Sequence, residues 1–183
     1  MRKEIEKLLQ SVQKPARYAG GELNSVMKDK SKVALRYAFC FPDTYEIGMS
    51  HLGMKILYGV ANAREDTWCE RVFAPADDME ALMRANSEPL FALESGDPIK
   101  DFDMIGFTMQ YELSYTNILN MLDLAGVPLR AEDRKSLTPI VAFGGPCACN
   151  PEPVAEFADI IFLGEGEETT NTVLDLLKEC KES

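Results

Sequence analysis

The sequence predicts a three-layer α/β fold, in which helices cover both faces of a doubly wound, mainly parallel sheet of five strands. The main observation is that short, apolar β-type runs alternate with helical patterns along most of the chain. Strands separated by helical segments need right-handed crossovers, which produce a parallel sheet. A chain of 183 residues is also long enough to bury one such core. We therefore expect one α/β domain over residues 32–183.

Residues 1–31 predict a helix and an arm on the outside of that domain. The first twelve residues carry an apolar stripe at helical spacing, with charged side chains elsewhere. The stripe consists of Ile5, Leu8, Leu9 and Val12. A single stripe has no core of its own, so we expect it to dock on the domain. Residues 14–25 are rich in proline, glycine and polar groups, which favours an extended segment.

Five runs are typical of buried strands, because they are short, apolar and bounded by turn residues. They are 33–39, 69–73, 103–109, 139–143 and 159–163, and residues 89–93 form a possible extra strand. Helical patterns are expected from Ser50 to Val60 and over 79–84, 114–125, 153–157 and 167–180. Asp77 or Asp78 is the expected cap of the second helix, and Gly126 ends the third. The loops after the first and third strands must lie side by side to form one crevice, which predicts a Rossmann-like fold with the flavodoxin-like strand order.

Composition and charge narrow the classes of protein. No window approaches the roughly 20 uninterrupted apolar residues that span a bilayer, and the first residues lack the apolar stretch of a secretory signal. We therefore expect a cytoplasmic protein with no membrane partner. Its five cysteines, an odd number, suggest reduced thiols. The net charge of −11 disfavours direct binding to nucleic acid.

In a doubly wound sheet, the ligand crevice lies beyond the carboxyl ends of the strands. Six of the chain's twelve glycines fall in the loops expected there, and glycine lets the backbone approach a ligand closely. These loops are 41–53, 108–115, 144–152 and 164–169. Common phosphate-binding motifs are missing from the sequence. No G-x-G-x-x-G follows the first strand, and no G-x-x-x-x-G-K-[ST] occurs.

Residues 43–48 read D-T-Y-E-I-G and follow the first strand directly. This loop resembles the D-x-H-x-x-G loop of the cobalamin-binding domains of methionine synthase and related mutases. Tyr45 stands where that family has the histidine that ligates cobalt. Thr108 and the pair Gly144–Gly145 match small residues that, in that family, leave room for the nucleotide tail of the cofactor. The resemblance implies a possible cobalamin site without the usual cobalt ligand.

Four longer runs carry a second resemblance: 14–18, 45–53, 110–117 and 150–153. Together with the 164–167 loop, they are similar to the N-terminal cobalamin-binding-like domain of a family of radical S-adenosylmethionine (SAM) proteins of poorly defined activity. The resemblance implies that the chain is a fragment of a longer protein, whose radical SAM barrel holds an iron–sulfur cluster and SAM. None of the five cysteines has the C-x-x-x-C-x-x-C spacing of that cluster. We therefore expect the barrel to lie outside this chain and to be its partner.

The loop positions and the resemblance together give a set of expected cofactor-binding residues. They are Asp43, Tyr45, Glu46, Gly48, His51, Thr108, Gln110, Tyr111, Gly144, Gly145, Pro146, Gly164, Glu165 and Gly166. No residue of the chain is expected to be catalytic or to bind a structural metal.

Some of these residues also have simpler interpretations. Asp43 and Glu46 suit either an acid–base pair or helix capping and binding of backbone amides. Tyr111 and Tyr115, one helical turn apart, suit either stacking on a planar ligand or packing in the core or at the domain interface. His51, the only histidine, either coordinates cobalt from a displaced position or is a solvated or packing residue early in a helix.

The pair Cys147 and Cys149 also has more than one interpretation. Two cysteines without a nearby histidine form half of a metal site or a reactive thiol pair. The other interpretation is two small side chains that fit a tight loop.

Three hypotheses of function follow. The first is an accessory domain that holds a corrinoid, or a relic of that site, over the radical SAM barrel of the same longer protein, and that is not catalytic alone. The second is a cofactor-free interaction module that docks the radical domain or its substrate, and Tyr45 favours it. The third is a stand-alone enzyme that uses a nucleotide, and the missing phosphate loop argues against it.

Overall fold

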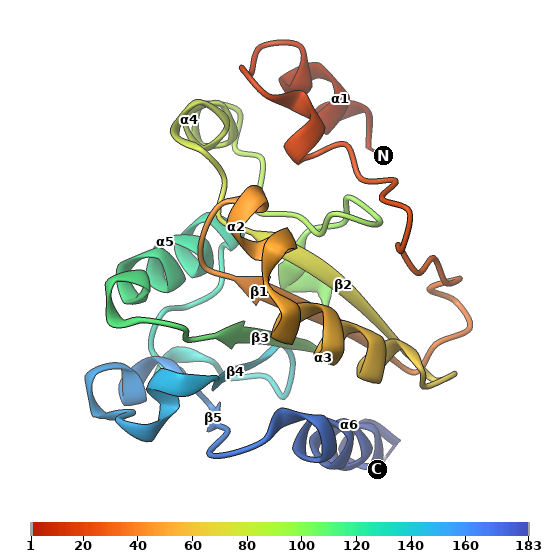
Figure 1. Ribbon diagram of the computed structural model, residues 1–183, viewed down its shortest axis with the longest axis vertical. Coiled ribbons are helices and arrows are strands. Elements are labelled where there is room, and N and C mark those ends of the chain that lie inside the picture. Colours follow the sequence, from red (N-terminus) through yellow and green to blue (C-terminus); the bar gives the residue numbers. More distant parts are fainter. Residues whose placement is uncertain (1, 183) are drawn as a thin grey trace.

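Five parallel strands form the centre of the computed structural model, which describes residues 2–182 (Figure 1). They are β1 (Leu35–Phe41), β2 (Thr67–Phe73), β3 (Met104–Thr108), β4 (Ile140–Gly144) and β5 (Ile160–Ile161). Their order in the sheet is β2-β1-β3-β4-β5, and every neighbouring pair is parallel. The predicted parallel sheet with the flavodoxin-like order is confirmed. Its strand order reverses between β1 and β3, so a ligand crevice is expected at the carboxyl ends of these two strands.

Helices cover both faces of this sheet (Figure 1). They are α1 (Lys3–Leu9), α2 (Tyr45–Ser50), α3 (Leu52–Asn62), α4 (Asp77–Ala85), α5 (Tyr115–Ala125) and α6 (Gly166–Glu182). One face packs against α4 and α5, and the other against α3 and α6. None of the helices in residues 2–182 combines the length and apolar character that a membrane span requires.

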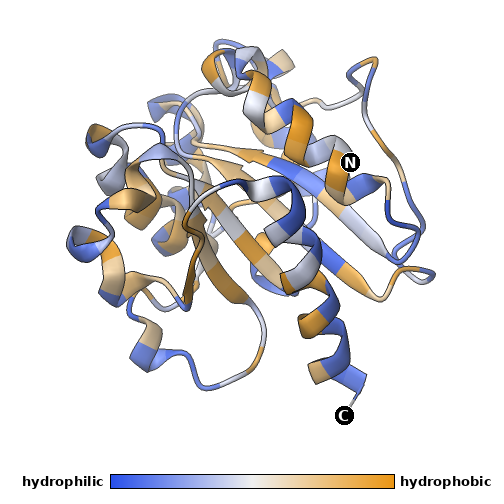
Figure 2. Ribbon diagram, turned by 60° about the horizontal axis from the view of Figure 1, so that its bottom comes forward, coloured by the Kyte–Doolittle hydropathy of each residue, from blue (hydrophilic) through white to orange (hydrophobic). Residues whose placement is uncertain are grey.

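The alternation of side chains along the strands supplies a hydrophobic cluster to each face. Cys40, Phe107 and Phe143 belong to the cluster beneath α4 and α5. Phe39 and Ala142 belong to the cluster beneath α3 and α6. Figure 2 shows the strands as mostly hydrophobic, whereas the helices carry hydrophilic residues as well. Burial of the strands on both sides therefore explains their nearly continuous apolar sequence.

The first crossover differs from the prediction, because the helix expected from Ser50 is two helices. The first, α2, begins at Tyr45 and ends at Ser50. His51 then adopts an extended conformation, with φ of −80° and ψ of 119°, before α3 begins. A helix of six residues has little stability of its own and a weak periodic pattern, so tertiary packing decides its presence. Gly48 permits this packing, because a Cβ there would lie 2.4 Å from the ring of Phe73.

The interpretation of residues 89–93 as a possible extra strand is wrong. The structure has only an isolated antiparallel bridge between Phe91 and Pro98 in this region. Leu90, Phe91, Ala92 and Leu93 are nevertheless buried. The apolar run therefore reflects burial of a loop, and a short apolar run alone cannot distinguish the two.

Two predicted helix details also need correction. The N-cap of α4 is Ala76 rather than an aspartate, although Asp78 accepts hydrogen bonds from the backbone amides of Gln13 and Met79. The helix expected at 153–157 is a 3₁₀ segment, Glu152–Phe157. Gly126 ends α5 as predicted, in the left-handed conformation with φ of 71°.

The N-terminal helix and arm pack on the sheet and its helices. Ile5 and Leu8 of α1 are buried in the cluster that includes α4. Residue 1 of the predicted helix lies outside the described residues. The arm continues past Tyr18, whose hydroxyl accepts a hydrogen bond from Ala76 N at 3.0 Å. It reaches Val26, whose carbonyl accepts one from Trp68 Nε1 at 2.9 Å.

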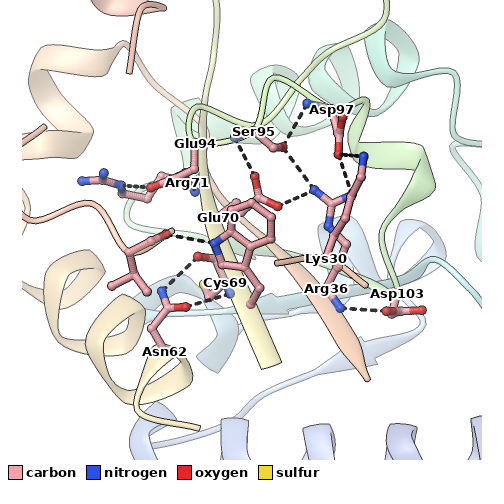
Figure 3. A network of polar contacts seen from close by, with 12 residues as sticks. Lys30, Arg36, Asn62, Cys69, Glu70, Arg71, Glu94, Ser95, Asp97 and Asp103 are labelled. Carbon is pink, nitrogen blue, oxygen red and sulfur yellow. Dashed lines mark hydrogen bonds and ion pairs between the residues drawn. The ribbon is translucent and has the colours of Figure 1, made fainter. Parts of the chain in front are cut away.

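The outer edge of β2 forms hydrogen bonds with side chains, because no further strand within residues 2–182 pairs with it (Figure 3). The Asn62 amide donates to Cys69 O at 2.9 Å and accepts from Cys69 N at 3.1 Å. The Glu94 carboxylate accepts from Arg71 N at 2.7 Å and pairs with the Arg71 guanidinium. Burial raises the pKa of Glu94, while the positive charge of Arg71 opposes this rise.

Candidate functional site

A cavity of about 360 Å³ opens at the carboxyl ends of the strands, on the face that α3 and α6 cover. Its floor is formed by alternate residues of β3 and β4, which point to this face and have small side chains or none. These residues are Gly106, Thr108, Ala142 and Gly144. Ligand cavities in proteins span roughly 300–1,000 Å³. The cavity therefore suits a small molecule or one part of a larger one.

The walls of the cavity are mainly apolar. Phe39 of β1, Ile56 and Leu57 of α3, and Phe162 after β5 line it, together with the start of α6. Gly166, the first residue of α6, lets the two helices approach each other, because a Cβ there would lie 3.1 Å from the Leu57 side chain. A mostly apolar cavity with a few polar groups is the usual form of a small-molecule site.

Gly145 shapes the mouth of the cavity. Its φ is +99°, and a Cβ there would lie 3.0 Å from Met109 O, so the loop requires glycine. The loop is fixed to the end of β3, because Cys147 N donates to Met109 O at 3.1 Å. Thr108 and Gln110 lie at the same end, where the Gln110 amide donates to the Thr108 hydroxyl. The mouth therefore combines close backbone approach with a small polar pair.

His51 lies at the mouth and caps α3. Its Nδ1 accepts a hydrogen bond from Met54 N at 3.2 Å, and its ring packs 5.2 Å from the ring of Phe41. Gly53 leaves room for the imidazole, because a Cβ there would lie 3.0 Å from its Cε1. In a neutral imidazole, a nitrogen that accepts a hydrogen bond leaves the proton on the other nitrogen. Nε2 of His51 is therefore a hydrogen-bond donor in this arrangement and has no free lone pair for a metal.

The structure thus brings most of the expected residues to one cavity. Nine of the fourteen line it, and they come from the ends of β3 and β4 and from the segments that follow β1, β3, β4 and β5. The nine are His51, Thr108, Gln110, Gly144, Gly145, Pro146, Gly164, Glu165 and Gly166.

The other five lie outside the cavity lining. Three of them, Tyr45, Glu46 and Gly48, are in α2 and face the arm or β2. The Tyr45 hydroxyl donates to Glu22 of the arm at 3.1 Å, and its ring lies edge-on to Phe73. Burial and the negative charge of Glu22 raise the pKa of Tyr45, so its phenolate is even scarcer than usual.

Asp43 and Glu46 bind different parts of the chain and do not form an acid–base pair. Glu46 pairs with Arg17 at 2.9 Å and with Lys14 at 3.4 Å. Asp43 accepts a hydrogen bond from Thr44 N and another from the Tyr111 hydroxyl. The bond to Asp43 raises the pKa of Tyr111 to about 12. Tyr111 therefore ties the loop after β3 to the loop after β1.

Tyr115 and the two loop cysteines lie on the other side of the mouth. Tyr115 is half-buried beside Cys147, and burial, with a smaller effect of that thiol, raises the pKa of Tyr115. Cys149 is exposed and contributes to the cavity lining. Within residues 2–182, no group of three or more His, Cys, Asp or Glu side chains is arranged to hold a metal ion. The structure therefore offers Cys147 and Cys149 no further protein ligands.

The floor and the inner end of the cavity were not predicted from the sequence. Tyr37, Phe39, Gly106 and Ala142 were interpreted only as parts of strands. A signal was present in the sequence, because residues 106, 108, 142 and 144 are all small and alternate with bulky residues. Two neighbouring strands with a small row on one face indicate a space above that face.

Comparisons with known proteins place the chain among its relatives. A family model described as "Radical SAM proteins, N-terminal" matches residues 53–183. The uncharacterized protein MJ0966 of Methanocaldococcus jannaschii is 27% identical over 139 residues, which cover 74% of this chain and 25% of that protein. The chain therefore spans about a quarter of the length of this relative.

Proposed function

This chain belongs to the family of N-terminal domains of radical SAM proteins, and on this premise we propose that it is an accessory domain that holds a corrinoid beside a radical SAM domain. The observation that carries the proposal is the cavity above β3 and β4. Its volume of about 360 Å³ suits a nucleotide tail and is too small for the corrin ring as well. The corrin would then lie at the mouth, against the loops that follow the strands.

The residues of the cavity fit such a tail. The row Gly106, Thr108, Ala142 and Gly144 provides a flat floor for a planar base, and Phe39 and Phe162 provide apolar contact. Gly145 lets the backbone of its loop come close to the ligand. His51 Nε2 would donate a hydrogen bond at the mouth. A bound corrinoid would supply methyl-transfer chemistry at its cobalt, and this chain would supply its binding and orientation.

The test is incubation of the chain with hydroxocobalamin, followed by gel filtration. We expect the corrinoid absorption bands to elute with the protein. The test variant is Ala142→Val, which adds two methyl groups to the cavity floor and should release the corrinoid. Its far-ultraviolet circular dichroism should stay unchanged, which is the control for folding. Complete loss of corrinoid from the unmodified chain at micromolar concentration would contradict the proposal.

We also expect the bound cobalt to have no nitrogen ligand from the protein. Tyr45 faces the arm, and the capping bond of His51 directs its Nε2 proton toward the mouth. The measurement is the electron paramagnetic resonance spectrum of the cob(II)alamin complex. A triplet splitting from one nitrogen that disappears in His51→Ala would show that His51 ligates cobalt.

A second candidate function is docking of the radical SAM domain at the mouth without a cofactor. The observation in its favour is three exposed leucines, which lie in the segments that follow β1, β3 and β5 and are within three residues of the cavity lining. They are Leu52, Leu113 and Leu163, with 68, 87 and 66% of their surfaces exposed.

The test of docking is association with the radical SAM domain of the same protein, produced separately. We expect Leu113→Ser and Leu163→Ser to weaken association about tenfold together, because apolar anchors dominate such contacts. Leu23→Ser is the matched control, since Leu23 is 99% exposed but lies in the arm. Equal effects of the control and the test variants would reject docking at the mouth.

A further inference from the structure

Tyr37 of β1 is a buried residue whose hydroxyl has no hydrogen-bond partner in the part of the chain that the structure describes. The residue is 3% exposed. Within residues 2–182 its hydroxyl makes no hydrogen bond, and it is not among the enclosed polar atoms that lack a partner, so it is open to the cavity that Tyr37 lines. The hydroxyls of four other tyrosines each have a partner, namely those of Tyr18, Tyr45, Tyr58 and Tyr111. A hydroxyl that opens into a cavity without a protein partner is available to hydrogen-bond a bound ligand.

The position of Tyr37 places this hydroxyl at the inner end of the cavity. Tyr37 lines the cavity and pairs in register with Met104, at the start of β3, whereas the mouth lies beyond Thr108 at the end of that strand. Gly106 gives the phenol its space, because a Cβ there would lie 2.5 Å from the Tyr37 hydroxyl oxygen. A base that enters from the mouth with its ring over the floor therefore meets this hydroxyl with its far edge.

The hydroxyl keeps its proton in this environment. Burial raises the pKa of Tyr37 well above its usual value. The group therefore offers one donor and a lone pair in a cavity whose lining is mainly apolar. A bound base is favoured when the edge that faces the Tyr37 hydroxyl carries an oxygen or nitrogen. It is disfavoured when that edge carries only methyl groups.

We propose that Tyr37 selects the base of the corrinoid tail, favouring a base with a polar far edge over one with a methylated far edge. The proposal rests on the proposed function, because it assumes that the tail occupies the cavity. A base such as 5-hydroxybenzimidazole presents a hydroxyl at its far edge, and adenine presents nitrogens. The base 5,6-dimethylbenzimidazole presents two methyl groups, which would leave the Tyr37 hydroxyl unpaired.

The experiment is titration of the 183-residue chain with four corrinoids, in which the change in corrinoid absorbance reports binding. Three carry the bases named above, and the fourth is cobinamide, which has no nucleotide tail. We expect the 5-hydroxybenzimidazole form to bind roughly threefold to tenfold more tightly than the dimethylbenzimidazole form, the worth of one neutral hydrogen bond. Cobinamide should bind most weakly.

Tyr37→Phe removes only the hydroxyl, and we expect it to abolish this preference or reverse it. Tyr58→Phe is the matched control on the same face of the sheet. The Tyr58 hydroxyl is already bonded to Val26 N at 2.7 Å, and Tyr58 is not among the cavity-lining residues. This variant should lose stability and keep the preference.

The outcomes separate the two proposals. Equal affinities for the hydroxylated and the methylated base, unchanged in Tyr37→Phe, would overturn the role of Tyr37 and leave corrinoid binding intact. Absence of binding by all four corrinoids would overturn the proposed function and this inference with it. A preference that Tyr37→Phe removes and Tyr58→Phe retains supports both.

Discussion

The two faces of β3 and β4 are packed in opposite ways. The face toward α5 carries a bulky row, and the face toward α3 and α6 carries a small row. The bulky row consists of Ile105, Phe107, Val141 and Phe143. The small row consists of Gly106, Thr108, Ala142 and Gly144. These eight residues therefore build a filled core on one side and a cavity on the other, and side-chain size, rather than loop length, sets the difference.

The largest loss of stability should come from a substitution on the face of β3 and β4 that carries the bulky row. Phe143→Ala removes a completely buried ring, and we expect a loss of about 3–5 kcal/mol in the free energy of unfolding, measured with urea. Phe162→Ala on the cavity side is the matched variant, because its ring is only partly buried and already borders empty space. Equal losses in the two variants would mean that the faces are packed alike.

A smaller effect should come from the cap of α3 at the cavity mouth. His51→Ala removes the acceptor of the Met54 amide, and we expect a loss of about 1 kcal/mol in stability. His51→Asn should recover most of this loss, because asparagine is a favoured N-cap residue. If the alanine and asparagine variants are equally stable, the capping bond contributes nothing, and it does not hold the proton of His51 on Nε2.

The amino-end side of the cavity face is held by ion pairs, which predicts a pH dependence. Asp66 binds Lys178 of α6 at 2.9 Å and Arg64, which follows α3, at 3.1 Å. Partial burial opposes ionisation, but the hydrogen bonds from Lys178 and Arg64 prevail and lower the pKa of Asp66 to about 2. The stabilisation is therefore fully present above the unfolded value of about 3.9 and is lost as the pH falls through about 2.

We expect Asp66→Asn to lower stability by up to about 1 kcal/mol at pH 6, since solvent screens these partly exposed pairs. The difference from the unmodified chain should shrink below pH 4 when both are unfolded with urea. A difference that stays constant from pH 6 to pH 2.5 would show that Asp66 acts through its shape and not its charge.

The smallest change in stability should come from the cavity floor itself. A Cβ at Gly144 would lie 3.4 Å from the Cβ of Phe162, an ordinary contact. Gly144→Ala should therefore change stability by less than about 1 kcal/mol, partly through the lower entropy of the unfolded chain. It should still weaken hydroxocobalamin binding severalfold in the gel-filtration assay, because the methyl group narrows the floor. Unchanged binding would place the ligand away from this row.

The fold could be predicted because each layer leaves a local signal. The runs at β1, β3 and β4 are apolar on both faces, and the segments between them carry helical periodicity. The sequence pattern gave the wrong secondary structure where tertiary packing overrides local preference. Burial of Leu90 and Phe91 made a loop resemble a strand, and α2 forms because Gly48 packs against Phe73.

The site could be predicted at its mouth but not at its inner end. Loop residues such as Gly145 and His51 stand out, because glycines and a lone histidine after strands are rare and informative. The direction of Tyr45 could not be predicted, since it depends on Glu22, which lies 23 residues away in the arm. Tyr37 remained hidden because a tyrosine in an apolar strand looks like ordinary core until its hydroxyl is found without a partner.

The side chains along the outer edge of β2 have a consequence for how the chain behaves among its own copies. A free strand edge is a template on which a second molecule can add its own strand, and this is a common start of aggregation. Asn62 occupies the edge at Cys69, and Lys28 donates to Thr67 O at 2.6 Å. The opposite edge, β5, is only two residues long. Neither edge thus offers a long template, and loss of the arm, which carries Lys28, would uncover part of the longer one.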